Sequence, residues 1–194
     1  DLRLDEYAYI NINPNDPKLM VTDERIKLGS VLPDYNAGFR NDFSYKGINL
    51  SLLFSARFGG IVVSPTQGFL DGLGVSKASA DARDAGGVPI NNGRIDAQHY
   101  YETVGLGQLL SHYTYSATNV RLQEMSIGYT FPKKWMGDRV KLTASLVGRN
   151  LWMIYCKAPF DPELTASTGS YLQGIDYFMQ PSLRSLGFNV QLKF

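Results

Sequence analysis

Two histidines and one pair of carboxylates are the side chains whose types could support metal binding or catalysis. His99 and His112 lie in a glycine-rich region, and neither has a cysteine or a paired carboxylate at a spacing typical of metal ligands. Asp161 and Glu163 flank Pro162, and a glycosidase works with two carboxylates. The nearby prolines favour a rigid loop instead, and the histidines fit a solvated loop. We therefore expect no catalytic residue, no metal and no cofactor.

Arg149 is a candidate ligand-binding arm, because the phase of its sequence pattern places it on a polar face. The alternative is an ion pair with carboxylates on that face, such as Asp42, and we expect this ion pair. Cys156 is the only cysteine, so the chain cannot form an internal disulfide. The formal net charge is +1 and there is no basic stripe, which argues against nucleic acid as a partner.

Alternation of apolar and polar residues is the main structural signal, and its period of two predicts β-strands with one apolar and one polar face. The pattern predicts five strands at Tyr35–Tyr45, Ile48–Phe58, Arg121–Phe131, Val140–Arg149 and Leu186–Phe194, with a sixth near Tyr7–Ile12. Val120 and Leu122 are out of phase with the residues that follow them. We therefore expect a bulge, or the edge of a membrane, near Gln123.

The connections between these strands alternate in length. Short turns at Lys46–Gly47 and Pro132–Asp138 alternate with long connections at residues 59–119 and 153–181, and residues 95–104 could form a short helix. In an antiparallel sheet all the long connections then fall at one end, which is typical of outer-membrane barrels. No apolar run reaches the ~20 residues of a membrane helix, whereas a membrane strand needs only ~9–11. The predicted fold is all-β: a segment of an antiparallel transmembrane β-barrel, with residues 59–119 and 153–181 as extracellular loops.

A soluble β-sandwich that binds glycans through loop aromatics is the alternative, since alternation also marks half-buried strands. A sandwich would bury Leu50, Leu52 and Phe54 against a second sheet, whereas a barrel would expose them to lipid. The chain begins with Asp1 rather than methionine, so we expect either a processed leader or a piece of a longer polypeptide.

Several motifs, in order, resemble the C-terminal part of SusC/RagA-type TonB-linked outer-membrane transporters of Bacteroidetes. They are Pro33–Tyr35, Phe43–Gly47, Val120–Pro132, Gly148–Trp152, Phe160–Glu163, Gly174–Asp176 and Pro181–Ser185. Each motif alone is weakly specific, and their shared order and spacing carry the resemblance, which spans about Ile26 to Phe194.

The resemblance implies a non-enzymatic importer of oligosaccharides or peptides in the outer membrane of a Gram-negative bacterium. It also implies a barrel of about 22 strands around an N-terminal plug. The implied partners are a SusD-like surface lipoprotein over the outer mouth, TonB acting through the plug, the remainder of the same barrel and the lipid bilayer. Neither the plug nor most of the barrel is in this chain. Five or six strands cannot close so wide a barrel, so we expect a fragment of a longer chain.

The phase of the strands predicts which side chains face each side of the barrel wall. Lumen-facing polar candidates are Arg40, Asp42, Asn49, Arg57, Lys141, Arg149, Asn189, Gln191 and Lys193. The final strand also resembles the aromatic-ended signal that the barrel-assembly machinery reads. Its candidates are Phe188, Val190, Leu192 and Phe194.

Overall fold

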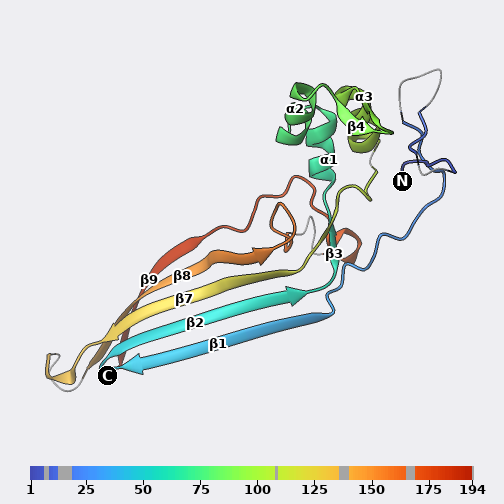
Figure 1. The fold of residues 1–194 in the computed structure, drawn as a ribbon. Coiled ribbons are helices and arrows are strands. Elements are labelled where there is room, and N and C mark those ends of the chain that lie inside the picture. Colours follow the sequence, from blue (N-terminus) through green and yellow to red (C-terminus); the bar gives the residue numbers. More distant parts are fainter. Residues whose placement is uncertain (7–8, 13–18, 108, 136–139, 165–168, 194) are drawn as a thin grey trace. The chain divides into compact units, whose positions relative to one another are not determined.

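The computed structural model describes residues 1–6, 9–12, 19–107, 109–135, 140–164 and 169–193. The chain divides into two compact units, each assembled from segments that are distant in sequence (Figure 1). The first unit comprises residues 1–31, 61–115 and 164–179. The second comprises residues 32–60, 116–163 and 180–194.

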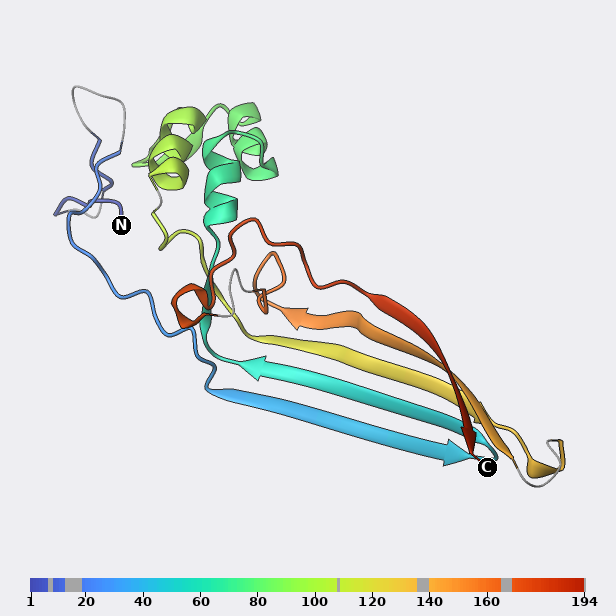
Figure 2. The same cartoon turned by 180° about the vertical axis from the view of Figure 1, so that it is seen from behind.

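The second unit is a five-stranded antiparallel sheet in the order β1-β2-β7-β8-β9 (Figures 1 and 2). Its strands are β1 (Tyr35–Tyr45), β2 (Ile48–Phe58), β7 (Asn119–Thr130), β8 (Lys141–Cys156) and β9 (Ser185–Lys193). Strands β1 and β9 form its two edges. The five strands expected from alternation are therefore present and are neighbours in space.

The cross-strand register places apolar residues in one row and polar residues in the next, as the alternation predicts. Leu50 lies opposite Ile127, which lies opposite Leu146, which lies opposite Phe188. One residue along, a polar row joins Asn49, Gly128, Ser145 and Asn189. Because successive side chains of a strand point to opposite faces, the sheet has one apolar face and one polar face.

A β-bulge at Gln123 explains the break in phase near that residue. Leu53 pairs with Glu124 and Phe54 pairs with Leu122, so Gln123 is the extra residue. On the other side of β7, residues 150 and 151 of β8 also lie outside the regular pairing, and Asn150 has a positive φ of 52°. Strand β8 continues beyond this irregularity to Cys156, so the expected end of the strand near Arg149 was too early.

The two short connections lie at the end of the sheet opposite the long ones. Lys46 and Gly47 form the β1–β2 turn with φ values of 47° and 88°, as a tight hairpin turn with the twist of the strands requires. The β7–β8 connection contains the 3-10 helix η2 (Lys133–Trp135), and residues 136–139 of the expected turn lie outside the described residues.

The first unit contains most of residues 59–119 and combines short helices with short strands. Its helices are α1 (Pro65–Gly72), α2 (Lys77–Asp84), α3 (Ala97–Tyr101), the π-helix η1 (Glu102–Leu106) and the 3-10 helix η3 (Ser170–Leu172). Its short strands are β3 (Ile61–Val63) with β6 (Thr114–Ser116), and β4 (Val88–Ile90) with β5 (Gly93–Ile95). Leu19, Ile95, Val104 and Tyr113 form its buried core.

The helix expected at residues 95–104 is present as α3 and η1, whereas α1 and α2 were not expected. Near the N-terminus, Ile10 and Ile12 make only isolated bridges, and Tyr7 lies outside the described residues. The described part of this region supplies no sixth strand to the sheet. Among the described residues, none of the helices has the length and apolar character needed to cross a membrane.

Hydrogen bonds join the start of α1 to the segment around residue 176. Ser64 caps α1 by accepting from the Gln67 N–H (3.1 Å) and donates its own hydroxyl proton to Asp176 Oδ2 (2.6 Å). Thr66 Oγ1 donates to the Asp176 carbonyl and accepts from the Phe178 N–H. Because Ser64 and Asp176 are both buried, these two distant segments form one folded body.

Candidate functional site

The apolar face of the sheet is exposed in the described structure. Phe188 is 68 % exposed and Leu146 is 60 % exposed, and Phe43 and Ile127 of the same row are exposed as well. Leu50, Leu52 and Phe54 are only half-buried. A sandwich would bury these three side chains, so the face supports the barrel rather than the sandwich.

The polar face carries the lumen-facing candidates, and several of its charges are paired within the sheet. Arg40 Nε lies 3.0 Å from Asp42 Oδ2, and Arg149 Nε lies 2.9 Å from Glu124 Oε2. An ion pair of Arg149 was expected, but the partner named for it, Asp42, was wrong. The bulge at Gln123 sets the register in which Glu124 lies directly opposite Arg149.

A polar hollow of about 270 Å³ lies near the short-turn end of the sheet, and its lining includes Asn49, Lys141 and Gln191. Asn49 Nδ2 donates to Thr130 Oγ1 (2.9 Å), which lies 3.0 Å from Thr143 Oγ1. The full lining is Asn49, Ser126, Gly128, Thr130, Lys141, Thr143, Ser145, Gln191 and Lys193. Four of the expected lumen-facing residues, Asn49, Lys141, Gln191 and Lys193, are therefore brought together in one concave surface.

The remaining candidates lie on the same face outside this hollow. Asn189 pairs with Ser145 in the register of β8 and β9. Arg57 pairs with Asn36 of β1 and Asn119 of β7 near the long-connection end. Of the assembly-signal candidates, Phe188, Val190 and Leu192 are exposed on the apolar face, and Phe194 lies outside the described residues.

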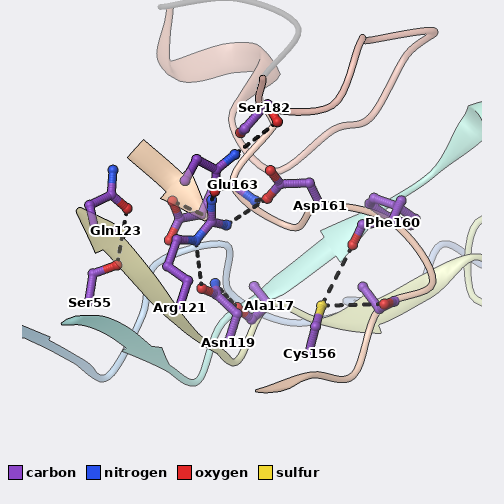
Figure 3. Close-up of polar contacts among 12 residues, drawn as sticks. Ser55, Ala117, Asn119, Arg121, Gln123, Cys156, Phe160, Asp161, Glu163 and Ser182 are labelled. Carbon is purple, nitrogen blue, oxygen red and sulfur yellow. Dashed lines mark hydrogen bonds and ion pairs between the residues drawn. The ribbon is translucent and has the colours of Figure 1, made fainter. Parts of the chain in front are cut away.

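Arg121 is the centre of a buried polar cluster that the sequence pattern did not reveal (Figure 3). Its side chain is 2 % exposed, and Nη2 lies 2.7 Å from Asp161 Oδ1 and 3.4 Å from Glu163 Oε2. Nε and Nη1 donate to the side-chain oxygens of Asn119 and Asn150. The cluster joins strand β7 to the segment that follows β8.

Asp161 is held in its ionised form within this cluster. Burial alone would raise its pKa, but hydrogen bonds from Arg121, Ser182 and the Glu163 N–H outweigh burial and lower it. Asp161 and Glu163, the pair that could resemble a glycosidase site, both contact the same buried arginine. This geometry makes them ion-pair partners that anchor the segment after β8.

The two histidines belong to the first unit. His99 is in α3, and partial burial and the nearby N-terminal ammonium group lower the pKa of His112. Within the ranges that the structure describes, no group of three or more His, Cys, Asp or Glu side chains could hold a metal ion.

Known proteins with similar sequences indicate which family this chain is related to. No protein-family model matches the chain. TonB-dependent receptor P3 of Formosa agariphila is 28 % identical over an alignment of 180 residues, which covers 89 % of this chain and 18 % of the relative. TonB-dependent receptor P26 of the same organism is 29 % identical over 185 residues, covering 91 % of this chain and 19 % of that relative.

Solved structures of the RagAB peptide importer match the fold of almost the whole chain. The open-open state superposes with a TM-score of 0.67 at 20 % identity, and the closed-closed state with a TM-score of 0.63 at 17 % identity. Each match covers 96 % of this chain. The chain is a homologue of the TonB-dependent receptors.

This homology has two direct consequences. The homology places the chain in the outer membrane of a Gram-negative bacterium. The chain spans about a fifth of the length of the TonB-dependent receptors and RagAB structures that it matches. The sheet therefore corresponds to one part of a much larger receptor barrel.

Proposed function

We propose that this chain forms part of the barrel wall and outer loops of a SusC-like, TonB-dependent importer. The apolar face of the sheet contacts lipid, and the polar face lines the lumen. The long connections, 59–119 and 153–181, lie on the extracellular side. The last strand carries the assembly signal, and the remaining strands, the plug and the contact with TonB come from the rest of the polypeptide.

The observation that carries this proposal is the contrast between the two faces of one sheet. Large apolar side chains such as Leu146 and Phe188 are exposed, whereas the opposite face carries ion pairs and a polar hollow. In water, so large an exposed apolar face would be unfavourable. In a bilayer the same face packs against the hydrocarbon chains of the lipids. An unclosed sheet edge in lipid is costly, which supports completion of the barrel by further strands.

The proposed cargo is a peptide or an oligosaccharide, taken up with a SusD-like surface lipoprotein. The RagAB structures are described as those of a peptide importer, which favours peptides. The same complex supports a lipoprotein partner of the RagB type.

Site-directed spin labelling of β9 tests the orientation of the wall. Single labels are placed at Phe188 and Val190 on one face and at Asn189 and Gln191 on the other. The sample is the full-length receptor in lipid vesicles, with native cysteines replaced by serine. We expect labels at 188 and 190 to be relaxed mainly by oxygen, which enters lipid, and labels at 189 and 191 by a water-soluble nickel complex. Labels at 188 and 190 that are shielded from both reagents would show a compact core and contradict the proposal.

Uptake by intact cells tests the cargo. A strain that lacks the receptor should lose uptake of labelled peptides or labelled oligosaccharides, and the receptor gene should restore it. The lipoprotein should copurify with the receptor from detergent extracts. Uptake that continues unchanged without the receptor, for both cargo classes, would contradict the importer function.

A further inference from the structure

The polar hollow contains two cations that face each other across the strand pair. Lys141 and Lys193 are directly opposite in the register of β8 and β9, and both line the hollow. Like charges in directly opposed positions destabilise a sheet unless another group compensates them. This pair therefore stands out from the other charges of the same face.

Two other cations on this face have carboxylate partners inside the sheet. Arg40 pairs with Asp42, and Arg149 pairs with Glu124. Among the described residues, neither Lys141 nor Lys193 forms an ion pair, and the lining of the hollow contains no carboxylate. The hollow thus has a positive charge that the described part of the sheet does not neutralise.

The rest of the lining is suited to bind an anion. Hydroxyl and amide groups of Thr130, Thr143 and Asn49 are already positioned by mutual contacts of 2.9 and 3.0 Å. Gln191 lies opposite Thr143 and adds an amide donor. Charge-assisted hydrogen bonds from lysine to a carboxylate are among the stronger polar contacts in proteins.

We propose that Lys141 and Lys193 bind a carboxylate side chain from a segment of the same polypeptide outside these 194 residues. Two observations favour this occupant. The charge of the hollow is complementary to an Asp or Glu side chain. The relatives are about five times longer than this chain, so most of the receptor is available to supply it. The inference rests on the proposed function, because the segment must lie against the lumen face of the wall.

Zero-length crosslinking of the full-length receptor tests this inference. A water-soluble carbodiimide joins a lysine amine to a carboxylate only where the two groups are in contact, and mass spectrometry identifies the joined peptides. We expect Lys141 or Lys193 to be joined to an Asp or Glu outside this chain. Lys77 and Asp81, which lie 2.6 Å apart on the exposed surface of α2, provide an internal positive control.

Matched variants make the result specific. The double variant Lys141→Arg/Lys193→Arg keeps both charges but removes both amines, and we expect complete loss of the crosslink while the Lys77–Asp81 crosslink persists. In the double variant Lys141→Gln/Lys193→Gln, the identified carboxylate loses its partners, and we expect a lower thermal midpoint of unfolding. Changing that carboxylate to its amide in the same background should then recover part of the loss.

Three results would overturn the inference. The first is an absence of crosslinks at both lysines in a sample where Lys77 reacts with Asp81. The second is a crosslink to a carboxylate of a bound cargo peptide or of another protein. The third is a crosslink only to carboxylates within these 194 residues. The spin-label accessibilities of β9 report on the barrel itself, so a failure of this site is distinguishable from a failure of the proposed function.

Discussion

Arg121 Nη2 lies 2.7 Å from Asp161 Oδ1, although the two residues are 40 positions apart in the sequence. Arg121 belongs to β7, and Asp161 follows the end of β8. Burial of a charged guanidinium group that is 2 % exposed is costly unless its charge is compensated, and the two carboxylates supply this compensation. The contact therefore fixes the base of the second long connection to the wall.

The substitution Asp161→Asn should loosen this connection strongly. Removing one partner of a buried ion pair typically costs about 3–5 kcal/mol, and here it leaves Arg121 with only the longer contact to Glu163. We expect faster hydrogen–deuterium exchange in residues 157–163 and a lower thermal midpoint. Glu163→Gln is the matched control and should have a smaller effect, because Glu163 is more exposed and its contact with Arg121 is longer, at 3.4 Å. Equal effects of the two variants would contradict the central role of Asp161.

Acid should release the same connection. The pKa of Asp161 is lowered in the folded protein, so its ion pair stabilises the fold at pH values above the ordinary aspartate pKa of about 3.9. This contribution is lost as the pH falls through the lowered value. The hydrogen–deuterium exchange of residues 157–163, after correction for the pH dependence of the exchange chemistry itself, should become faster below about pH 4. The pH dependence should be reduced in Asp161→Asn, and an unchanged acid transition in that variant would assign it to another group.

The exposed pair of Arg149 and Glu124 should contribute little to stability. Side-chain exposures of 69 % and 30 % allow water to screen the pair, so we expect a coupling free energy below about 1 kcal/mol. A double-mutant cycle with Arg149→Ala and Glu124→Ala, measured by urea unfolding in lipid vesicles, gives this value. The same cycle with Asp42→Ala in place of Glu124→Ala should show no coupling to Arg149. A larger coupling to Asp42 would show that the pairing in the membrane differs.

Two glycines on the polar face should differ in their tolerance of alanine. A Cβ at Gly128 would lie 2.7 Å from the Cβ of Ser145 and 3.0 Å from the carbonyl oxygen of Ala144. A Cβ at Gly187 would meet only the Val147 carbonyl oxygen, at 3.9 Å. Gly128→Ala should therefore cost about 1–3 kcal/mol of unfolding free energy, as overpacking usually does. Gly187→Ala should be tolerated, and comparable losses in urea unfolding would contradict the close approach of β7 and β8.

Loss of the Ser64 hydroxyl should affect two distant segments together. Ser64→Ala removes the cap of α1, which typically costs about 1 kcal/mol, and also removes a hydrogen bond from the buried Asp176. We expect hydrogen–deuterium exchange to increase in residues 65–72 and also in residues 175–178. Ser76→Ala, which removes the cap of α2, should change exchange only near α2. A change confined to α1 in the Ser64 variant would show that the two segments are independent.

The strands were predictable because each of them carries its own pattern. Alternation places Leu50 and Phe188 on one face without knowledge of their neighbours, and the phase break after Leu122 locates the bulge at Gln123. The predicted strand at Val140–Arg149 was shorter than β8, because Asn150 and Leu151 interrupt the pairing and the alternation after them starts in a new phase.

Alternation alone did not predict the polar contacts or the helices α1 and α2. The partner of Arg121 comes from a connection whose path no periodicity describes, and the partner of Arg149 depends on the register set by the bulge. Helices α1 and α2 did leave a signal. Ser64 followed by Pro65 is a typical helix start, and residues 77–84 are rich in alanine. A search for caps as well as alternation would have found them.

The bond from Ser64 to Asp176 limits how such receptors can be recombined. A chimera that takes residues 59–119 from one homologue and residues 157–184 from another would separate the hydroxyl donor from the carboxylate that it was matched to. Exchange of either segment alone should therefore yield chimeras that fold incorrectly, even when both parents fold well. The two segments should be moved together in any chimera.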